Sequence, residues 1–230
     1  MISGKKSTVY LSVGKKKTSV WIYGNLKNPI ILFIHGIPIP FSRMTGDLPI
    51  KYLQNEYCIV AFDLPGFGVS KDISVDHETF IDAVINRVSP KRKVSLFGSS
   101  FGGMVAFRYA YLNPTKIRNV IIAGTPFYSQ FIVNFLKIIS SFKPRQFLKI
   151  IDYVVFLNKH NLSSLKMPIL LLYSGNDKLA TVQMGRKLES LLENSTYIES
   201  SSRTHSWLLH RVDKSGFLES IKTFLKNNSS

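Results

Sequence analysis

The chain has 230 residues, 45% of them hydrophobic and 19% charged, which suits one globular domain with a sizeable core. Its single cysteine, Cys58, excludes a disulfide framework within the chain. The sequence has no run of about 18 uncharged apolar residues, so a membrane-spanning helix is not predicted. Because no apolar stretch follows the lysines near the N-terminus, a secretory signal is not predicted and we expect a cytoplasmic protein.

The charge balance is strongly basic, with a formal net charge of +16 and a pI of about 9.9. Such a balance occurs in proteins that bind nucleic acid, anionic membranes or acidic partners, and also where lysines only solvate the surface. The sequence contains no nucleic-acid-binding module and no basic stripe interleaved with aromatic residues. We therefore expect no nucleic-acid partner.

Apolar, β-branched and aromatic runs recur along the chain and predict strands. In chain order the predicted strands are residues 8–13, 18–23, 29–34, 57–62, 94–97, 117–123, 167–173 and 196–199. A glycine and three lysines separate the first two runs, which predicts an antiparallel hairpin. The run at 29–34 is apolar throughout, as expected of a strand that is covered on both faces.

Segments with helical spacing of apolar residues lie between most of these strands. The predicted helices are residues 44–55, 76–88, 104–112, 131–142, 145–157, 181–193 and 207–225. A hairpin followed by alternating strands and helices predicts an α/β fold, with a mostly parallel central sheet and helices on both faces. In such sheets, ligands bind beyond the carboxyl ends of the strands.

The sequence Gly98-Ser99-Ser100-Phe101-Gly102 joins a predicted strand to a predicted helix. It matches G-x-S-x-G, in which a sharp, strained turn holds a serine hydroxyl clear of the sheet edge. Spacing selects Ser100 over Ser99, because Ser100 has glycine two residues away on either side. A glycine- and serine-rich turn that merely ends a strand is the alternative.

A serine needs a base to accept its proton and an acid to orient that base. Four residues with suitable chemistry follow predicted strand ends: His35, Ser100, Asp177 and His205. The order serine, aspartate, histidine along the chain is the order that the α/β-hydrolase arrangement uses.

These segments together resemble the α/β-hydrolase-fold serine hydrolases of the carboxylesterase type. The resemblance rests on His35-Gly36-Ile37-Pro38, on the run from Asp63 to Ser70, on 98–103, and on the strand that ends near Asp177. It implies Ser100 as nucleophile, His205 as general base and Asp177 as the orienting acid. One position departs from the family pattern, since Ser174 stands where a glycine usually precedes the acid.

The resemblance also implies an oxyanion hole made of two backbone N–H groups, those of Ile37 and Phe101. It implies neither a cofactor nor a metal ion. Rival residues fit less well. Among the other histidines, His35 belongs to the oxyanion loop and His210 lies inside the last predicted helix. His77 and His160 do not follow a predicted strand end. Asp152 is a weaker candidate for the acid.

Residues 127–165 interrupt the alternation where this superfamily inserts its lid, so we expect a hydrolase core of residues 1–126 and 166–230 with a short helical lid. The lid sequence is rich in both apolar and basic residues, with Lys137, Lys143, Arg145, Lys149, Lys159 and the adjoining Lys166 opposed only by Asp152. Its apolar faces are expected to cover the active site. Basic and apolar residues together also suit an anionic membrane surface or an acidic carrier protein.

The expected function is hydrolysis of short or medium acyl esters or lactones, through an acyl-enzyme on Ser100. A serine at this position argues against dehalogenases and epoxide hydrolases of the fold, which use an aspartate. Three alternatives stay open: a carbon–carbon hydrolase, a hydrolase of carrier-protein esters, and a non-catalytic ligand-binding protein.

Overall fold

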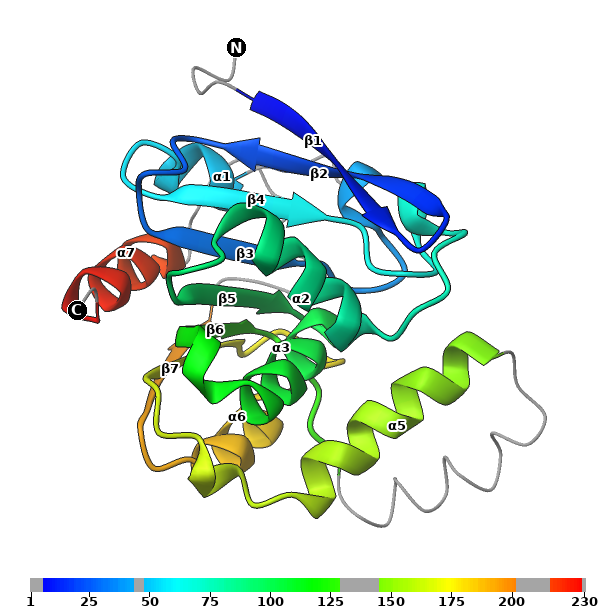
Figure 1. Ribbon diagram of the computed structural model, residues 1–230. Helices are drawn as coiled ribbons and strands as arrows, with labels where there is room; N and C mark the ends of the chain where they lie inside the picture. The colour runs from blue at the N-terminus through cyan, green and yellow to red at the C-terminus, as the bar shows by residue number, and fades with distance from the viewer. Residues whose placement is uncertain (1–5, 44–47, 129–144, 202–215, 229–230) are drawn as a thin grey trace.

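The computed structural model describes residues 6–43, 48–128, 145–201 and 216–228. Strands in these ranges form one sheet in the order β1-β2-β4-β3-β5-β6-β7-β8 (Figure 1). The strands are β1 (Lys6–Val13), β2 (Lys16–Tyr23), β3 (Ile30–Ile34), β4 (Cys58–Phe62), β5 (Val94–Ser99), β6 (Ile117–Ala123), β7 (Ile169–Ser174) and β8 (Ser195–Ser200). The β1–β2 and β2–β4 pairs are antiparallel and the other neighbours are parallel, which confirms the predicted hairpin and the mostly parallel sheet.

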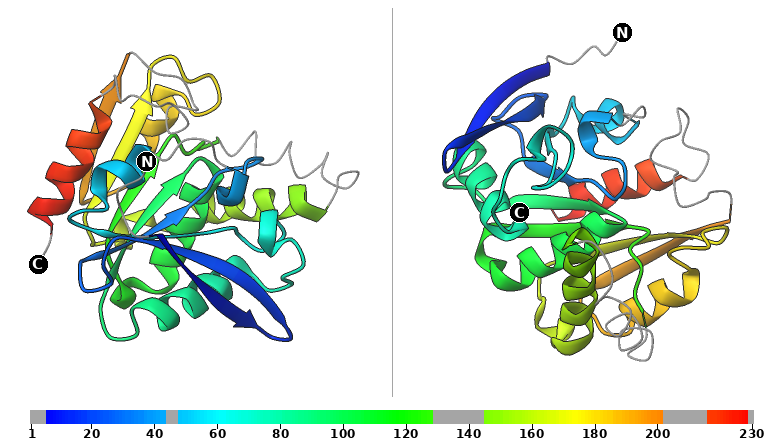
Figure 2. Two further views of the ribbon diagram at one scale, coloured as in Figure 1. Left: turned by 90° about the horizontal axis from the view of Figure 1, so that it is seen from above. Right: turned by 90° about the vertical axis from the view of Figure 1, so that its right-hand side faces the viewer.

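Helices cover both faces of the sheet, as the two further views show (Figure 2). The helices are α1 (Leu48–Leu53), α2 (His77–Val88), α3 (Phe101–Leu112), α5 (Arg145–Lys159), α6 (Val182–Glu189) and α7 (Phe217–Asn227). Buried side chains of α2, α3, α5 and α6 join one hydrophobic cluster, and those of α1 and α7 join a second cluster on the opposite face. Short 3-10 turns complete the described elements at Phe41–Arg43, Gly68–Ser70, Pro114–Lys116 and Leu162–Ser164.

The central strands are apolar on both faces because helices cover both. Every residue of β3 and β4 is buried, including Cys58, which is packed as an ordinary core side chain. Burial raises the pKa of the Cys58 thiol to about 11, so the group stays protonated at neutral pH. No helix of the described ranges is long and apolar enough to cross a membrane.

Several predicted helices differ from the observed ones at their ends. The helix predicted at 44–55 is shorter, since α1 covers only Leu48–Leu53 and residues 44–47 lie outside the described residues. The helix predicted at 181–193 ends early, because α6 stops at Glu189. The helix predicted at 131–142, and residues 207–215 of the last predicted helix, also lie outside the described residues.

Strand register brings the carboxyl ends of the parallel strands to one edge of the sheet. Ser99 at the end of β5 is opposite Ala123 of β6, and Ala123 is opposite Leu172 of β7. Ile34 at the end of β3 is opposite Gly98 on the other side of β5. The segments that follow β3, β5, β6 and β7 therefore meet at this edge, which is where the candidate site lies.

Candidate active site

Ser100 sits in a sharp turn between β5 and α3. Its backbone φ is 53° and its ψ is −118°, a conformation that is strained for a residue with a side chain. The flanking glycines leave the space that the turn needs. A Cβ at Gly98 would lie 2.5 Å from the Gly102 carbonyl oxygen, and one at Gly102 would lie 2.2 Å from the Ile34 carbonyl oxygen.

Three hydrogen bonds hold this strained residue in place. The Ser100 N–H donates to the Ala123 carbonyl at 2.9 Å, and the Ser100 carbonyl accepts from the Gly103 N–H at 3.0 Å. The Thr125 hydroxyl donates to the same Ser100 carbonyl at 2.9 Å. Hydrogen bonds with the end of β6, with the segment that follows it and with the first turn of α3 thus stabilise the strained backbone of Ser100. Strained residues in folded proteins persist only where the surrounding structure holds them in this way.

Sequence reasoning missed two residues that support this turn, one just after β6 and one near the end of β7. Thr125 is fully buried, and its own carbonyl accepts a hydrogen bond of 2.6 Å from the hydroxyl of Tyr173, which is also fully buried. Burial raises the pKa of Tyr173, so its hydroxyl remains a donor. The only signal was position, since both residues lie at strand ends.

The segment after β3 passes directly against Ser100. A Cβ at Gly36 would lie 3.0 Å from Cβ and 3.7 Å from Oγ of Ser100. Ile37 follows Gly36, and Phe101 follows Ser100 at the first position of α3. Each of the two residues predicted to supply the oxyanion hole is therefore the chain neighbour of a residue at this contact.

Both ring nitrogens of His35 are hydrogen-bonded to the backbone, one of them within this segment. Its Nδ1 donates to the Gly36 carbonyl at 2.7 Å, and its Nε2 accepts from the Leu64 N–H at 3.0 Å. Burial lowers the pKa of His35, although the Gly36 carbonyl and the nearby Asp63 act in the opposite direction. A neutral ring with one donor and one acceptor matches both contacts.

Asp63 organises the turn that follows β4. Its two carboxylate oxygens each accept a backbone N–H at 2.8 Å, from Ser42 and from Val69. The side chain is fully buried. The Asp63 carboxylate thus ties the segment that follows β3 to the turn that follows β4.

Asp177 lies just after β7 and is only 4% exposed. Its Oδ1 accepts the N–H groups of Leu179 at 2.8 Å and Ala180 at 2.9 Å, and its own N–H donates to the Ser174 carbonyl at 3.0 Å. Ser174 in place of a glycine is accommodated as the last residue of β7, paired with Ser200. The carboxylate is fixed by its loop, at the same edge as Ser100.

His205 and His210 lie outside the described residues. The remaining rivals have other contacts. Nδ1 of His77 is 3.0 Å from the Tyr153 hydroxyl in a buried cluster, and His160 bonds the Phe156 carbonyl at 3.0 Å near the end of α5. Asp152 is exposed on α5.

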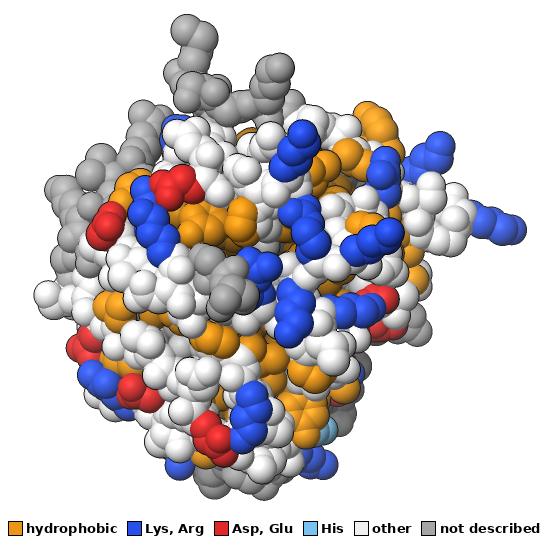
Figure 3. Space-filling view, turned by 60° about the vertical axis from the view of Figure 1, so that its left-hand side comes forward, with side chains coloured by type: hydrophobic (Ala, Val, Ile, Leu, Met, Phe, Trp, Pro, Cys, Tyr) orange, Lys and Arg blue, Asp and Glu red, His pale blue; other side chains and the backbone are white. Residues whose placement is uncertain are grey.

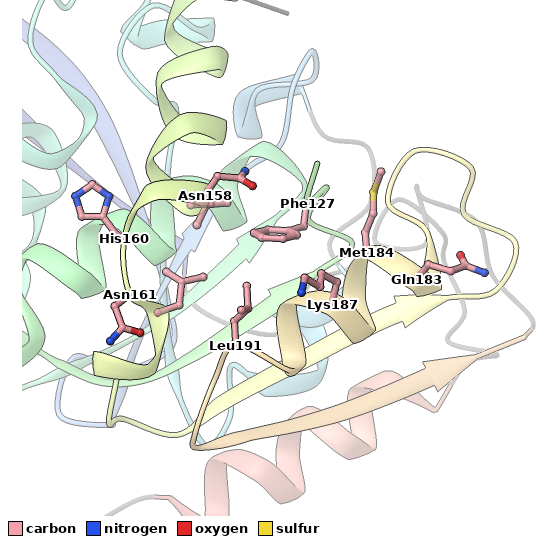
Figure 4. Close-up of a pocket in the computed structure, with 10 residues that line it drawn as sticks. Phe127, Asn158, His160, Asn161, Gln183, Met184, Lys187 and Leu191 are labelled. Atoms are coloured by element: carbon pink, nitrogen blue, oxygen red, sulfur yellow. The ribbon is translucent and has the colours of Figure 1, made fainter. Parts of the chain in front are cut away.

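A pocket of about 710 Å³ lies between the end of α5 and α6 (Figure 4). Phe127 contributes to its wall and stands two residues after Thr125, the support of the nucleophile turn. Most of its lining area is apolar, although five of its ten lining residues are polar: Phe127, Leu157, Asn158, His160, Asn161, Leu162, Gln183, Met184, Lys187 and Leu191. The volume lies in the usual range for a small-molecule site.

The described residues contain no group of three or more histidine, cysteine, aspartate or glutamate side chains that could hold a metal ion. These residues offer a partly buried serine in a strained turn and a buried carboxylate, both at the same edge of the sheet.

Comparison with known proteins places the chain in a class. The family model of the α/β hydrolase fold matches residues 29–154, so the chain belongs to this family. A pimeloyl-[acyl-carrier protein] methyl ester esterase from Shewanella woodyi is 34% identical over 97 residues, which are 42% of this chain and 36% of the relative. The match thus spans about a third of the length of that curated relative.

Solved structures of low sequence identity share the fold over the whole chain. An esterase from Pyrococcus furiosus superposes with a TM-score of 0.74 at 17% identity, covering 100% of this chain and 93% of the other. A thermophilic esterase from Thermogutta terrifontis gives a TM-score of 0.73 at 16% identity, covering 98% and 100% of the two chains. The α/β-hydrolase fold expected from the sequence is thereby confirmed.

Proposed function

We propose that the protein is a serine hydrolase of carboxylic esters, acting through an acyl-enzyme on Ser100. The observation that carries the proposal is the strained backbone of Ser100, with the Gly36 segment against its Oγ. A binding protein has no need of a serine held in this conformation, whereas a nucleophile does.

In the proposed mechanism, Ser100 Oγ attacks the ester carbonyl while His205 accepts the hydroxyl proton. Asp177 orients His205 and stabilises the imidazolium that forms. The backbone N–H groups of Ile37 and Phe101 stabilise the oxyanion, and one such donor typically contributes about 3 kcal/mol to the transition state. His205 then protonates the leaving alcohol, and water activated by His205 releases the acid from Ser100.

Neighbouring residues of the same type provide matched controls for this assignment. Hydrolysis of p-nitrophenyl esters should fall by roughly a thousandfold or more in Ser100→Ala, but stay near wild type in Ser99→Ala. Asp177→Asn should likewise be impaired where Asp152→Asn is not. A fluorophosphonate probe should label Ser100 in the folded protein, and the absence of labelling would favour a non-catalytic binding protein.

The pocket between α5 and α6 is proposed to take the apolar part of the ester. Support comes from its apolar lining and from Phe127, which links it to the Ser100 turn through Thr125. Met184→Trp should shift the preferred acyl chain towards shorter lengths and raise KM only for the longer esters. An unchanged chain-length profile would place the acyl group elsewhere.

A more specific candidate is an ester attached to an acidic carrier protein. The relatives whose names specify a pimeloyl-carrier methyl ester favour it, and so does the basic sequence of the predicted lid. A panel that contains simple esters, lactones, thioesters, vinylogous diketones and carrier-protein methyl esters separates this candidate from the carbon–carbon hydrolases. The highest kcat/KM in the panel identifies the substrate class.

A further inference from the structure

The edge of the sheet opposite the candidate active site carries a concentrated positive charge. Three segments lie at the amino ends of β3, β5 and β6, at residues 24–29, 89–93 and 113–118, the last of which includes the first two residues of β6. They contain Lys27, Lys91, Arg92, Lys93, Lys116 and Arg118, and no acidic residue. We call this surface the amino-edge basic face.

Contacts between the segments show that these charges form one surface. The Arg92 guanidinium donates to backbone carbonyls of the 24–29 loop, at 2.5 Å to Leu26 and 3.1 Å to Lys27. The Asn119 side chain donates to the Asn228 carbonyl at 3.3 Å, which joins the start of β6 to the end of α7 and its Lys226. Figure 3 shows Lys and Arg side chains gathered on one face of the molecule, with hydrophobic side chains among them.

Some of this charge is balanced, because Lys116 pairs with Asp82, and both Lys222 and Lys226 of α7 pair with Glu56. Lys27, Lys91 and Lys93 are exposed. Within the described residues, no carboxylate forms an ion pair with any of these three lysines.

The opposite edge has a different balance. The described loops at 63–76 and 175–181 contain four aspartates against Lys71 and Lys178, while Lys15, Lys16 and Lys17 lie at this end of the sheet in the β1–β2 hairpin. The two loops therefore carry no excess of positive charge, in contrast to the three segments of the amino-edge basic face. Proximity of like charges costs free energy, and a surface that accumulates them is suited to a polyanionic partner.

Exposed apolar side chains lie within the basic face. Leu26 is 40% exposed beside Lys27, and Leu112 is 53% exposed just before the 113–118 segment. A surface that offers both cations and exposed leucines matches an anionic lipid bilayer, where charges meet headgroups and apolar groups enter the interface. Nucleic acid would instead favour exposed aromatic rings. Tyr52, an aromatic residue near this edge, is already engaged within the protein, because the Lys222 ammonium lies over its ring and its hydroxyl donates to Glu219.

We propose that the amino-edge basic face docks the protein on anionic membrane surfaces. The candidate active site lies at the opposite edge of the sheet, so it faces away from the bilayer when the face is docked. Docking is therefore independent of the ester substrate, and binding vesicles leaves the kcat/KM of a water-soluble ester unchanged. Attraction between the face and the lipid charge weakens as salt shortens the Debye length.

The test measures sedimentation of the protein with vesicles of phosphatidylcholine, alone or with about a third phosphatidylglycerol. Wild type is expected to bind only the anionic vesicles. Each lysine near an anionic surface contributes roughly fivefold to the partition coefficient, so the triple variant Lys27→Gln, Lys91→Gln, Lys93→Gln loses about a hundredfold.

The matched control is Lys15→Gln, Lys16→Gln, Lys17→Gln, which removes the same charge from the β1–β2 hairpin. This hairpin turn lies on the carboxyl-end side of the sheet, because Val20 of β2 is opposite Phe62 at the end of β4. The control is expected to bind nearly as wild type does. Equal losses in the two triple variants would overturn the proposal, since net charge alone would then explain binding. Activity on a soluble ester reports that both variants are folded.

Two further measurements distinguish a bilayer from other polyanions. Leu26→Ser with Leu112→Ser keeps the charge and is expected to weaken vesicle binding several-fold. Unchanged vesicle affinity in this variant would overturn the membrane assignment. Tighter binding of the wild type to duplex DNA or single-stranded RNA than to anionic vesicles would assign the face to nucleic acid instead.

Discussion

The hydroxyl of Thr125 offers the most selective way to disturb the proposed nucleophile without touching it. Thr125 is fully buried, and its Oγ1 lies 2.9 Å from the carbonyl oxygen of Ser100. Thr125→Val replaces Oγ1 with a methyl carbon, for which contacts shorter than about 3.5 Å are unfavourable. The substitution therefore removes a hydrogen bond and also pushes against the strained turn.

The expected loss of stability is modest. A buried hydrogen bond contributes about 1–1.5 kcal/mol, and the Ser100 carbonyl keeps its bond from the Gly103 N–H. An unfolding entropy of about 2.1 cal/mol/K per residue gives roughly 0.5 kcal/mol/K for 230 residues, so Tm should fall by about 2–3 °C. The effect on the reaction should be larger, because a displacement of about 1 Å in an active site can cost a hundredfold. A shift of about half that size corresponds to roughly a tenfold loss of kcat.

The assay compares kcat, KM and Tm for wild type, Thr125→Val and Thr125→Ser on one p-nitrophenyl ester. The serine variant keeps the hydroxyl and should retain most of the wild-type kcat. The valine variant should lose kcat with little change in KM. Wild-type kcat in Thr125→Val would refute the view that this hydroxyl holds the nucleophile turn.

Three further predictions concern the oxyanion segment, its histidine and the predicted lid. Gly36→Ala places a Cβ 3.0 Å from Cβ of the nucleophile, so kcat/KM should fall at least about tenfold with Tm nearly unchanged; retained activity would contradict this geometry. Burial lowers the pKa of His35 below its usual 6.5, so the folded ring stays neutral while the unfolded ring gains a proton. The contribution of His35 to the free energy of unfolding should therefore be fully present above about pH 6.5 and fall below it, by at most about 1.4 kcal/mol per pH unit. In urea titrations, the fall should be shallower in His35→Asn. Parallel declines in the variant and the wild type would contradict the assignment. Added salt should lower kcat/KM for a carrier-bound ester and leave kcat/KM for a neutral ester unchanged. The double variant Lys143→Glu, Arg145→Glu should reproduce that loss at low salt. Equal responses of the two esters would show that the charge of the predicted lid has no role.

Local patterns in the sequence were enough to predict the architecture. The apolar runs at 29–34 and 57–62 predicted buried strands, which β3 and β4 confirm. The glycine spacing around Ser100 predicted a tight turn, and the positive φ at that residue is what such spacing permits. Strand ends also indicated where chemistry gathers, because parallel strands place their carboxyl ends at one edge.

Contacts between distant segments were not predictable from one sequence. Thr125 and Tyr173 look like ordinary residues at strand ends, and only the packed sheet brings the tyrosine hydroxyl to the Thr125 carbonyl. Helix ends were also uncertain. The helical pattern at 181–193 continues past Glu189, but the following residues turn back towards β8 instead. Propensity records which conformations a segment prefers, whereas tertiary packing decides where the segment ends.

From its contacts we expect helix α5 to be a fixed wall and not a flap. Tyr153 on this helix is buried, its ring meets the ring of Phe101 at a centroid distance of 5.3 Å, and its hydroxyl donates to Glu78 at 2.8 Å. Val154 and Leu157 belong to the same hydrophobic cluster as α2 and α3. Swinging α5 outward would expose these side chains to water on every turnover.

The space beside α5 should consequently keep one width throughout the catalytic cycle. A rigid cavity selects substrates by size, and binding is lost abruptly once the acyl group no longer fits. Rates across a homologous series of acyl chains should then show a sharp cut-off at one chain length, where a hinged cover would give a gradual decline.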